Sequence, residues 1–179
     1  MSTPEDRIRQ AGFQLSAAHP VVGSYVKCVR AGSLLFVSGH GPFVDGQAAH
    51  TGKVGADLSL EEGQEAARAV ILNILGTLKM ELGELSRIAR FVKLLVMVNA
   101  IPEYDQQHLV ANGATDFLVQ IFGDVGRPAR TPMGVGSLPM NFAVEIEAVV
   151  EVQDWPPAAP DKLSDIVSMT LIKPIGQRG

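Results

Sequence analysis

Residues 59–83 read SLEEGQEAARAVILNILGTLKMELG, and residues 88–98 read IARFVKLLVMV. Ser59 and Glu62 fit a capping box, in which each side chain bonds the backbone N–H of the other residue. The apolar residues that follow recur at helical spacing as far as Gly83, which predicts a helix of about six turns with one buried stripe. Residues 88–98 carry apolar side chains on nearly both faces, which indicates a central strand.

Two strands joined by a short turn are expected before this helix. Residues 25–30 and 34–38 are rich in apolar and β-branched side chains, and the turn between them contains Gly32, so we expect a hairpin. A glycine-containing loop follows, and a short strand is expected near residues 47–50.

A second helix and two further strands are expected after the central strand. Pro102 suits the first turn of a helix that we expect to run to Phe122. Strands are expected at residues 130–138 and 142–152. This order predicts an α+β fold with an antiparallel or mixed sheet and both helices on one face. The other face then needs a cover, which oligomerisation is one way to provide.

The composition is that of one globular domain and does not favour nucleic-acid binding. Of the 179 residues, 46% are hydrophobic and 19% charged, an ordinary balance for a folded chain. The net charge is −4 and no Lys/Arg cluster is present, whereas nucleic-acid binders gain affinity by neutralising phosphates. With one cysteine, no intramolecular disulfide is possible. The first residues do not resemble a secretory signal, and no apolar run is long enough for a bilayer, so we expect a cytoplasmic protein without membrane contact.

The chain divides into three parts by composition. Residues 1–19 are expected to form an N-terminal extension, residues 20–152 the main domain, and residues 153–179 a Pro-rich linker with a C-terminal extension. Residues 165–173 have the residue types of one more strand. Because this segment is too apolar for a freely solvated tail, we expect it to dock on its own or a neighbouring subunit.

Three motifs resemble those of the Rid/YjgF family. They are SGHGP at residues 38–42, PART at 128–131, and LP at 138–139 followed by VEIEA at 144–148. In the family these positions read SGQ-x-P, PAR[ST] and LP…[VI]EIEA, and the resemblance covers roughly residues 20–152. The loops resemble those of its long-loop branch, whose members are often labelled L-PSP endoribonucleases.

The resemblance implies a fold, an assembly and an activity. The fold is chorismate-mutase-like, and the assembly is a homotrimer with three clefts between subunits. The best-known activity of the family is hydrolysis of enamines and imines, such as 2-aminoacrylate, to 2-keto acids and ammonia. The family uses no metal or organic cofactor.

Arg130, Glu145 and Tyr25 are the candidate catalytic residues. A guanidinium can hold a carboxylate with two hydrogen bonds, and the matching arginine of the family anchors the substrate carboxylate; a structural salt bridge is the alternative. Glu145 and Glu147 share one face of a strand because side-chain direction repeats every two residues. The resemblance makes Glu145 the residue that positions water. The alternative is that both glutamates form ordinary surface pairs. Tyr25 matches a tyrosine of the family that closes the cleft. The alternative is that Tyr25 packs in the core of a subunit interface.

Four more residues are candidates for substrate binding. Ser38 and Gly39 would line the pocket, since glycine allows the backbone to approach a ligand closely. His40 stands where many relatives have glutamine, and is either a titratable group beside the pocket or a packed loop histidine. Asn112 falls near a family site asparagine, with one residue inserted. Pro132 replaces a cysteine that is frequent in the well-known deaminases, which puts the substrate in doubt.

Three functions are compatible with these residues. The first is a deaminase of small carboxylate-bearing imines and enamines. The second is a non-catalytic trimeric binder of small carboxylates, acting as a sensor or scavenger. The third is an endoribonuclease, which the acidic charge disfavours. The four histidines show no metal-ligand spacing, so no metal site is expected.

Overall fold

A computed structural model describes residues 2–15, 21 and 23–153, and it contains a five-stranded sheet in the order β1-β2-β7-β5-β6. Its strands are β1 (Cys28–Ala31), β2 (Leu34–His40), β5 (Ile88–Asn99), β6 (Ala129–Val135) and β7 (Val144–Val152). The β5–β6 pair is parallel and the other pairs are antiparallel. The expected α+β fold with a mixed sheet is therefore confirmed. A separate small hairpin joins β3 (Phe43–Val44) to β4 (Gln47–Ala48).

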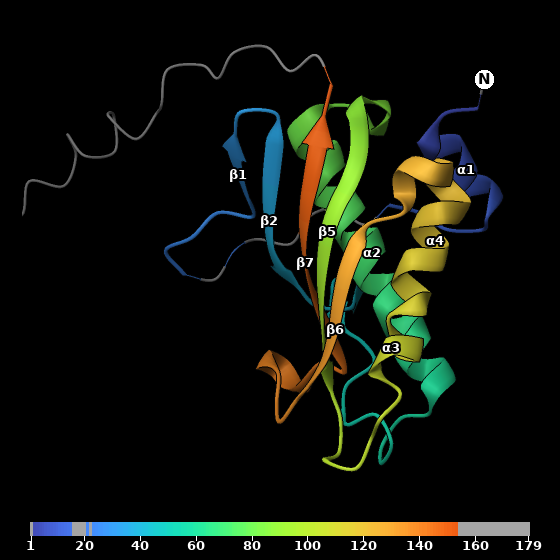
Figure 1. The fold of residues 1–179 in the computed structure, drawn as a ribbon, viewed down its shortest axis with the longest axis vertical. Helices are drawn as coiled ribbons and strands as arrows, with labels where there is room; N and C mark the ends of the chain where they lie inside the picture. Colours follow the sequence, from blue (N-terminus) through green and yellow to red (C-terminus); the bar gives the residue numbers. More distant parts are fainter. Residues whose placement is uncertain (1, 16–20, 22, 154–179) are drawn as a thin grey trace, which may run out of the picture.

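The helices lie together on one face of the sheet (Figure 1). They are α1 (Pro4–Gln10), α2 (Leu60–Leu82), α3 (Gln107–Val110) and α4 (Asn112–Phe122), with 3-10 turns η1 (Leu85–Arg87), η2 (Gly123–Gly126) and η3 (Pro139–Asn141). The predicted capping box begins α2: the Ser59 N–H donates to Glu62 Oε2 at 2.8 Å, and the Glu62 N–H donates to Ser59 Oγ at 3.2 Å. Gly83 ends the helix with φ +81°, a conformation that favours glycine. Among the described residues, no helix has the length and apolar character needed to cross a bilayer.

The core fills the space between the helices and one face of the sheet. From β5, the side chains of Phe91, Leu94, Val96 and Val98 are buried there, and α2 contributes one continuous apolar stripe. From α1, Ile8 is 1% exposed and belongs to the same core. The β5 side chains on this face are buried, and most of the others on the strand are only partly exposed, which fits the predicted central strand.

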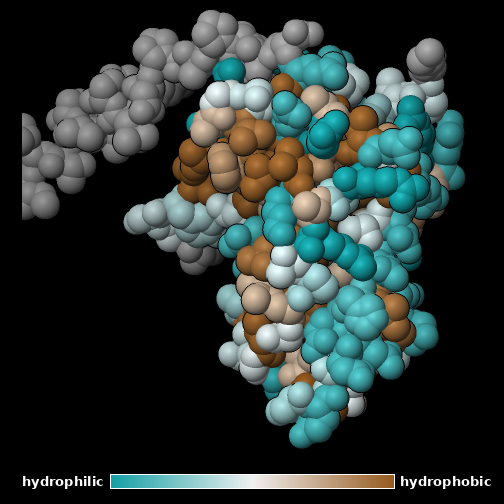
Figure 2. All heavy atoms as spheres, in the orientation of Figure 1, coloured by the Kyte–Doolittle hydropathy of each residue, from teal (hydrophilic) through white to brown (hydrophobic). Residues whose placement is uncertain are grey.

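The opposite face of the sheet carries an exposed apolar patch. Phe36 and Val29 lie opposite each other on β2 and β1 and are 46% and 54% exposed. Together with Leu95 and Val149 they line a hollow of about 270 Å³, and we call these four residues the open-face patch. Figure 2 shows apolar atoms gathered over β1, β2 and β7 on this face. Large contiguous apolar patches on soluble proteins commonly mark interaction sites.

The second helix departs from the sequence prediction. It begins at Gln107 and not at Pro102, and it is divided into α3 and α4. On α2, Gln64 Nε2 donates to the carbonyl oxygen of Leu109 at 2.9 Å. A continuous helix would use that oxygen for the N–H of residue 113, so this side chain replaces a helical bond at the break. The expected strands at 130–138 and 142–152 are also shorter, and the strand expected at 165–173 lies outside the described residues.

Candidate functional site

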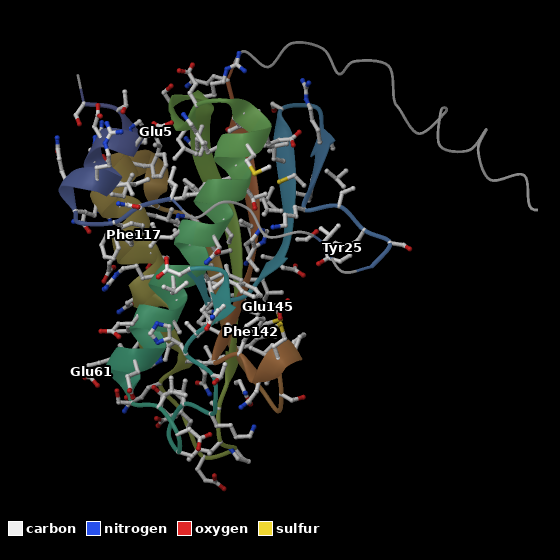
Figure 3. All side chains as sticks on the ribbon, turned by 180° about the vertical axis from the view of Figure 1, so that it is seen from behind. Glu5, Tyr25, Glu61, Phe117, Phe142 and Glu145 are labelled. Carbon is white, nitrogen blue, oxygen red and sulfur yellow. The ribbon has the colours of Figure 1, made fainter. Side chains whose placement is uncertain are left out.

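A cleft of about 430 Å³ opens at the end of β2 where β1 no longer covers it. Four of the residues predicted for the site line it together: Tyr25, Gly39, His40 and Glu145. They come from the segment before β1, the end of β2 and the start of β7. Figure 3 shows Tyr25, Glu145 and Phe142 grouped at this end of the sheet.

A β-bulge in β2 shapes the cleft. Val37 pairs with Ala148 and His40 with Ile146, so the two residues Ser38 and Gly39 stand opposite Glu147 alone. A β-carbon placed on Gly39 would lie 3.1 Å from Cδ of Glu145 and closer still to its Oε1. The carboxyl group of Glu145 therefore lies directly across the backbone of Gly39. Glycine leaves room for it in this position without a shift of the carboxyl group.

Glu145 is the carboxyl group with the perturbed acidity in this cleft. It is partly buried, and burial is the main cause that raises its pKa; the negative charge of Glu147 raises the pKa further. Both glutamates lie on the face of β7 opposite the buried Val144 and Ile146, as the alternation predicts. A raised pKa favours the protonated form, so such a carboxyl group can serve as a general acid as well as a base.

The side chain of His40 points toward α2 and is held there by hydrogen bonds. It is 8% exposed, its Nδ1 lies 2.6 Å from the Ser38 carbonyl oxygen, and its Nε2 lies 2.8 Å from Oγ1 of Thr77 on α2. A carbonyl oxygen only accepts hydrogen bonds, so Nδ1 carries a proton, while Nε2 and the threonine hydroxyl share the second hydrogen bond. His40 therefore forms part of the cleft wall as a packed and hydrogen-bonded side chain.

The cleft contains polar residues that the sequence analysis did not place there. Asn73 on α2 is 3% exposed, and its Nδ2 donates to the carbonyl oxygens of Phe43 and Ala69, both at 2.8 Å. Its Oδ1 has no hydrogen-bond donor among the described residues. The sequence feature that could have identified Asn73 is an amide side chain within the apolar stripe of a helix. Lys27 also lines the cleft. The feature that could have identified it is its spacing of two residues from Tyr25, just before a strand.

Aromatic and apolar side chains make up the rest of the wall. The rings of Phe43 and Phe142 pack edge to face with centroids 5.2 Å apart. Phe142 lies over Gly41, where a β-carbon would collide with the ring. Pro139 and Met140 of η3 complete this side. The cleft thus combines a mainly apolar wall with a few polar groups, as small-molecule sites commonly do.

Arg130 lies apart from this cleft in the single chain. It is near the start of β6 at the sheet edge, and β5 separates β6 from β7. Its Nη1 donates to Thr115 Oγ1 at 2.9 Å and its Nη2 to the carbonyl oxygen of His108 at 3.1 Å. Asn112 begins α4, in the segment between these two partners. Arg130 and Asn112 therefore belong to a second region, beside α3 and α4.

Ser38 also points away from the cleft. Its hydroxyl donates to the Val26 carbonyl oxygen at 2.8 Å, and the residue borders the hollow of the open-face patch. Among residues 2–15, 21 and 23–153, no group of three His, Cys, Asp or Glu side chains could hold a metal ion. The chemistry available in the cleft is therefore that of Glu145, Tyr25, Lys27 and the amide of Asn73.

Comparisons with known proteins place these features in one family. A family model described as "YjgF/chorismate_mutase-like, putative endoribonuclease" matches residues 5–152. Protein TCP17 of Trypanosoma cruzi is 43% identical over 148 residues, which is 82% of this chain and 92% of that protein.

Two solved structures are similar over most of their length. The protein Atu1372 of Agrobacterium tumefaciens is 42% identical with a TM-score of 0.80, covering 84% of this chain and 92% of that one. A "putative endoribonuclease" of Shewanella oneidensis is 33% identical with a TM-score of 0.82, covering 84% of this chain and 99% of that one.

Proposed function

Because the chain belongs to the YjgF/chorismate-mutase-like family, we propose that it is an imine and enamine deaminase. Its substrates are small carboxylate-bearing imines, which it converts to keto acids and ammonia. The observation that carries this proposal is the Glu145 carboxyl group, which lies across Gly39 in a mainly apolar cleft and has a raised pKa.

Glu145 supports hydrolysis by moving protons. As a carboxylate it accepts a proton from water while the water oxygen bonds to the carbon of the protonated imine, which gives a neutral carbinolamine. As a carboxylic acid it returns that proton to the nitrogen. As the C–N bond breaks, the carboxylate takes the proton of the carbinolamine hydroxyl, and this proton passes to the ammonia, so that a keto acid and ammonium leave. Burial and the charge of Glu147 raise the pKa of Glu145, which favours the acid form that the second step requires. The hydroxyl of Tyr25, at the same cleft, can hydrogen-bond the substrate or the water.

The substrate carboxylate is bound by Arg130 in this proposal. Since Arg130 lies on the edge strand β6 and outside the cleft of its own chain, a second copy brings the two together. The open-face patch supplies apolar surface for the association, and the proposed assembly is a homotrimer. Each site then consists of Tyr25 and Glu145 of one subunit and Arg130 of the next.

Hydrolysis of imines made in situ tests the function. An amino-acid oxidase produces the imine, and ammonia release is followed with and without this protein, at an oxidase concentration that does not limit the rate. We expect the protein to accelerate ammonia release, and Glu145→Gln to reduce the acceleration about a hundredfold. Glu147→Gln, which changes a neighbouring carboxylate on the same strand, is the matched control and should remain active. No acceleration by the unchanged protein would refute the proposal.

A carboxylate-binding protein without catalysis is the second candidate. The observation that favours it is the His40 ring, which is held by hydrogen bonds to Ser38 and Thr77 and so does not add an acid or base to the chemistry of the cleft. Calorimetry with pyruvate separates the two candidates. Binding without accelerated ammonia release would support the binding protein.

A further inference from the structure

Lys27 is a cation in the cleft that the proposed mechanism does not use. Its carbonyl oxygen accepts a hydrogen bond from the Ser38 N–H at 2.9 Å, which fixes its backbone beside the bulge of β2. Its side chain lines the cleft together with Tyr25 and Glu145. The backbone of Lys27 is therefore fixed by its hydrogen bond to β2, and its side chain belongs to the cleft wall.

The charge of Lys27 is not matched by a carboxylate within the part of the chain that the structure describes. Among the described residues, no Asp or Glu forms an ion pair with it. Partial burial removes water from the ammonium group, and this loss of solvation lowers the pKa of Lys27. The pKa of Glu145 is raised by burial and by Glu147, and not lowered as it would be beside a paired cation. A partly desolvated cation without a counter-ion gains stability when a ligand brings an anionic group.

We propose that Lys27 binds a second anionic group of the ligand, so that the cleft accepts imines of acidic amino acids, which carry two carboxylates. The proposal rests on the proposed function, in which Arg130 of a neighbouring copy takes the carboxylate next to the imine carbon. Lys27 then takes the carboxylate at the far end of the substrate. Hydrolysis of such an imine with one water gives a 2-oxo dicarboxylate and ammonia, without any change of oxidation state.

The dimensions and the lining of the cleft agree with this class of ligand. A volume of about 430 Å³ lies within the usual range for small-molecule sites and holds a five-carbon dicarboxylate. Phe43, Met140 and Phe142 provide apolar contact for the methylene groups between the two carboxylates. His40 is bonded to Ser38 and Thr77, which leaves Lys27 as the side chain suited to a distal anion among the described lining residues.

A pair of ligands that differ in one carboxylate tests the proposal. 2-Oxoglutarate and 2-oxovalerate have the same five-carbon skeleton, and only the first carries a distal carboxylate. We expect calorimetry to show at least tenfold tighter binding of 2-oxoglutarate to the unchanged protein. Lys27→Met should abolish this preference, while Lys27→Arg should retain most of it because it keeps the charge.

The matched control is Lys79→Met. Lys79 lies on α2, where its Nζ donates to Glu5 Oε1 at 2.6 Å, and it lines neither the cleft nor the hollow of the open-face patch. Its replacement removes the same charge from the protein and should leave the preference intact. Circular dichroism of each variant shows that the fold is retained before affinities are compared.

Three results would overturn the proposal: equal affinity for the two ligands, a preference that survives Lys27→Met, or binding of neither. The binding measurement is independent of the ammonia assay, so the two failures can be told apart. Imine hydrolysis without a preference for dicarboxylates refutes only the role of Lys27. A Lys27-dependent preference without hydrolysis refutes only the catalytic proposal.

Discussion

The carboxyl group of Glu145 occupies the space that a side chain on Gly39 would need. A β-carbon on Gly39 would meet Cδ of Glu145 at 3.1 Å and Cγ at 3.4 Å, and Oε1 is nearer still. The bulge of β2 creates this arrangement, because it places both Ser38 and Gly39 opposite Glu147. The position of the carboxyl group therefore depends on a residue that has no side chain.

Gly39→Ala should displace Glu145 and impair the site. The added methyl group forces the carboxyl group to move, and displacing a catalytic group by about 1 Å can cost about a hundredfold in rate. Thermal unfolding should reveal a destabilisation of at most about 1 kcal/mol, the low end for an overpacked position, because the colliding atoms are the end of a flexible side chain that can shift. Gly136→Ala is the control, since a β-carbon on Gly136 meets no atom within 4 Å, and it should change neither rate nor stability.

Removing Glu145 should relieve this clash. The three nearest atoms to the added β-carbon all belong to Glu145, so Gly39→Ala should destabilise the Glu145→Ala variant less than the unchanged protein. The coupling between the two substitutions should be about 0.5–1 kcal/mol, the low end for contacting pairs. Additive effects on the unfolding free energy would show that the two residues do not contact each other.

Glu147→Gln should shift the pH dependence of hydrolysis. The negative charge of Glu147 disfavours ionisation of Glu145 and is the second cause of its raised pKa, after burial. Without that charge the pKa of Glu145 falls, so its carboxylate form persists to lower pH. The acidic limb of the kcat/KM profile should therefore move to lower pH.

Glu151→Gln is the control for this shift. Glu151 lies on the same strand but does not contribute to the pKa of Glu145. Its replacement should leave the profile in place. Titration of the Glu145 side-chain carbon by NMR gives the same comparison without activity. An acidic limb that moves to higher pH in Glu147→Gln would contradict the assignment of the base.

Local signals made most of the fold predictable. The capping box at Ser59 and the helix end at Gly83 depend on residues within a few positions, and the structure has both where the sequence indicates. The start of the following helix was predicted wrongly at Pro102. The break after α3 depends on Gln64, 45 residues away along the chain, which bonds the Leu109 carbonyl. No pattern within the helix itself contains that contact.

The candidate site was predictable in part for the same reason. The resemblance placed Tyr25, Gly39 and Glu145 in one pocket, and these three residues line one cleft. Arg130 lies outside the cleft of its own chain because β6 pairs in parallel with β5 at the sheet edge, and its place in a site between subunits stays a prediction. Lys27 was missed because a lysine before an edge strand has the appearance of an ordinary exposed residue.

Arg130→Ala should abolish binding of pyruvate and leave the fold intact. In the proposed assembly the guanidinium makes charge-assisted hydrogen bonds to the ligand carboxylate, whose loss costs several kcal/mol in a desolvated site. Among the described residues the variant loses the bonds to Thr115 and His108, each worth about 1 kcal/mol. Calorimetry measures the first effect and thermal unfolding the second.

Thr115→Val separates the two roles of Arg130. It removes the internal hydrogen bond and keeps the guanidinium, so pyruvate affinity should be retained. Similar loss of affinity in Thr115→Val and Arg130→Ala would mean that Arg130 acts only through the structure of the α3–α4 region.

Cys28 should react slowly with iodoacetamide in the folded protein. Burial, and secondarily the negative charge of Glu81, raise the pKa of its thiol to about 12, although Lys27 opposes the shift. Since the thiolate is the reactive form, alkylation at pH 7.5 should be at least about a hundredfold slower than in the denaturant-unfolded chain. Mass spectrometry follows the modification. Equal rates in the two states would show that Cys28 is accessible and ionised.

Phe36→Glu should dissociate the proposed trimer. The unchanged protein should have a mass of about 57 kDa by light scattering, three times the 19.1 kDa of one chain. Phe36 lies in the open-face patch beside Val29, so a buried carboxylate there would lack a partner and oppose association. Met80→Glu introduces the same charge at a side chain on α2 that is 70% exposed, on the helical side, and should remain trimeric.

Because Arg130 reaches the cleft only from a neighbouring copy in this proposal, Phe36→Glu should lose imine hydrolysis together with the assembly. An active monomer would show that one chain contains the whole site, and a trimer that survives the substitution would exclude the open-face patch as its interface.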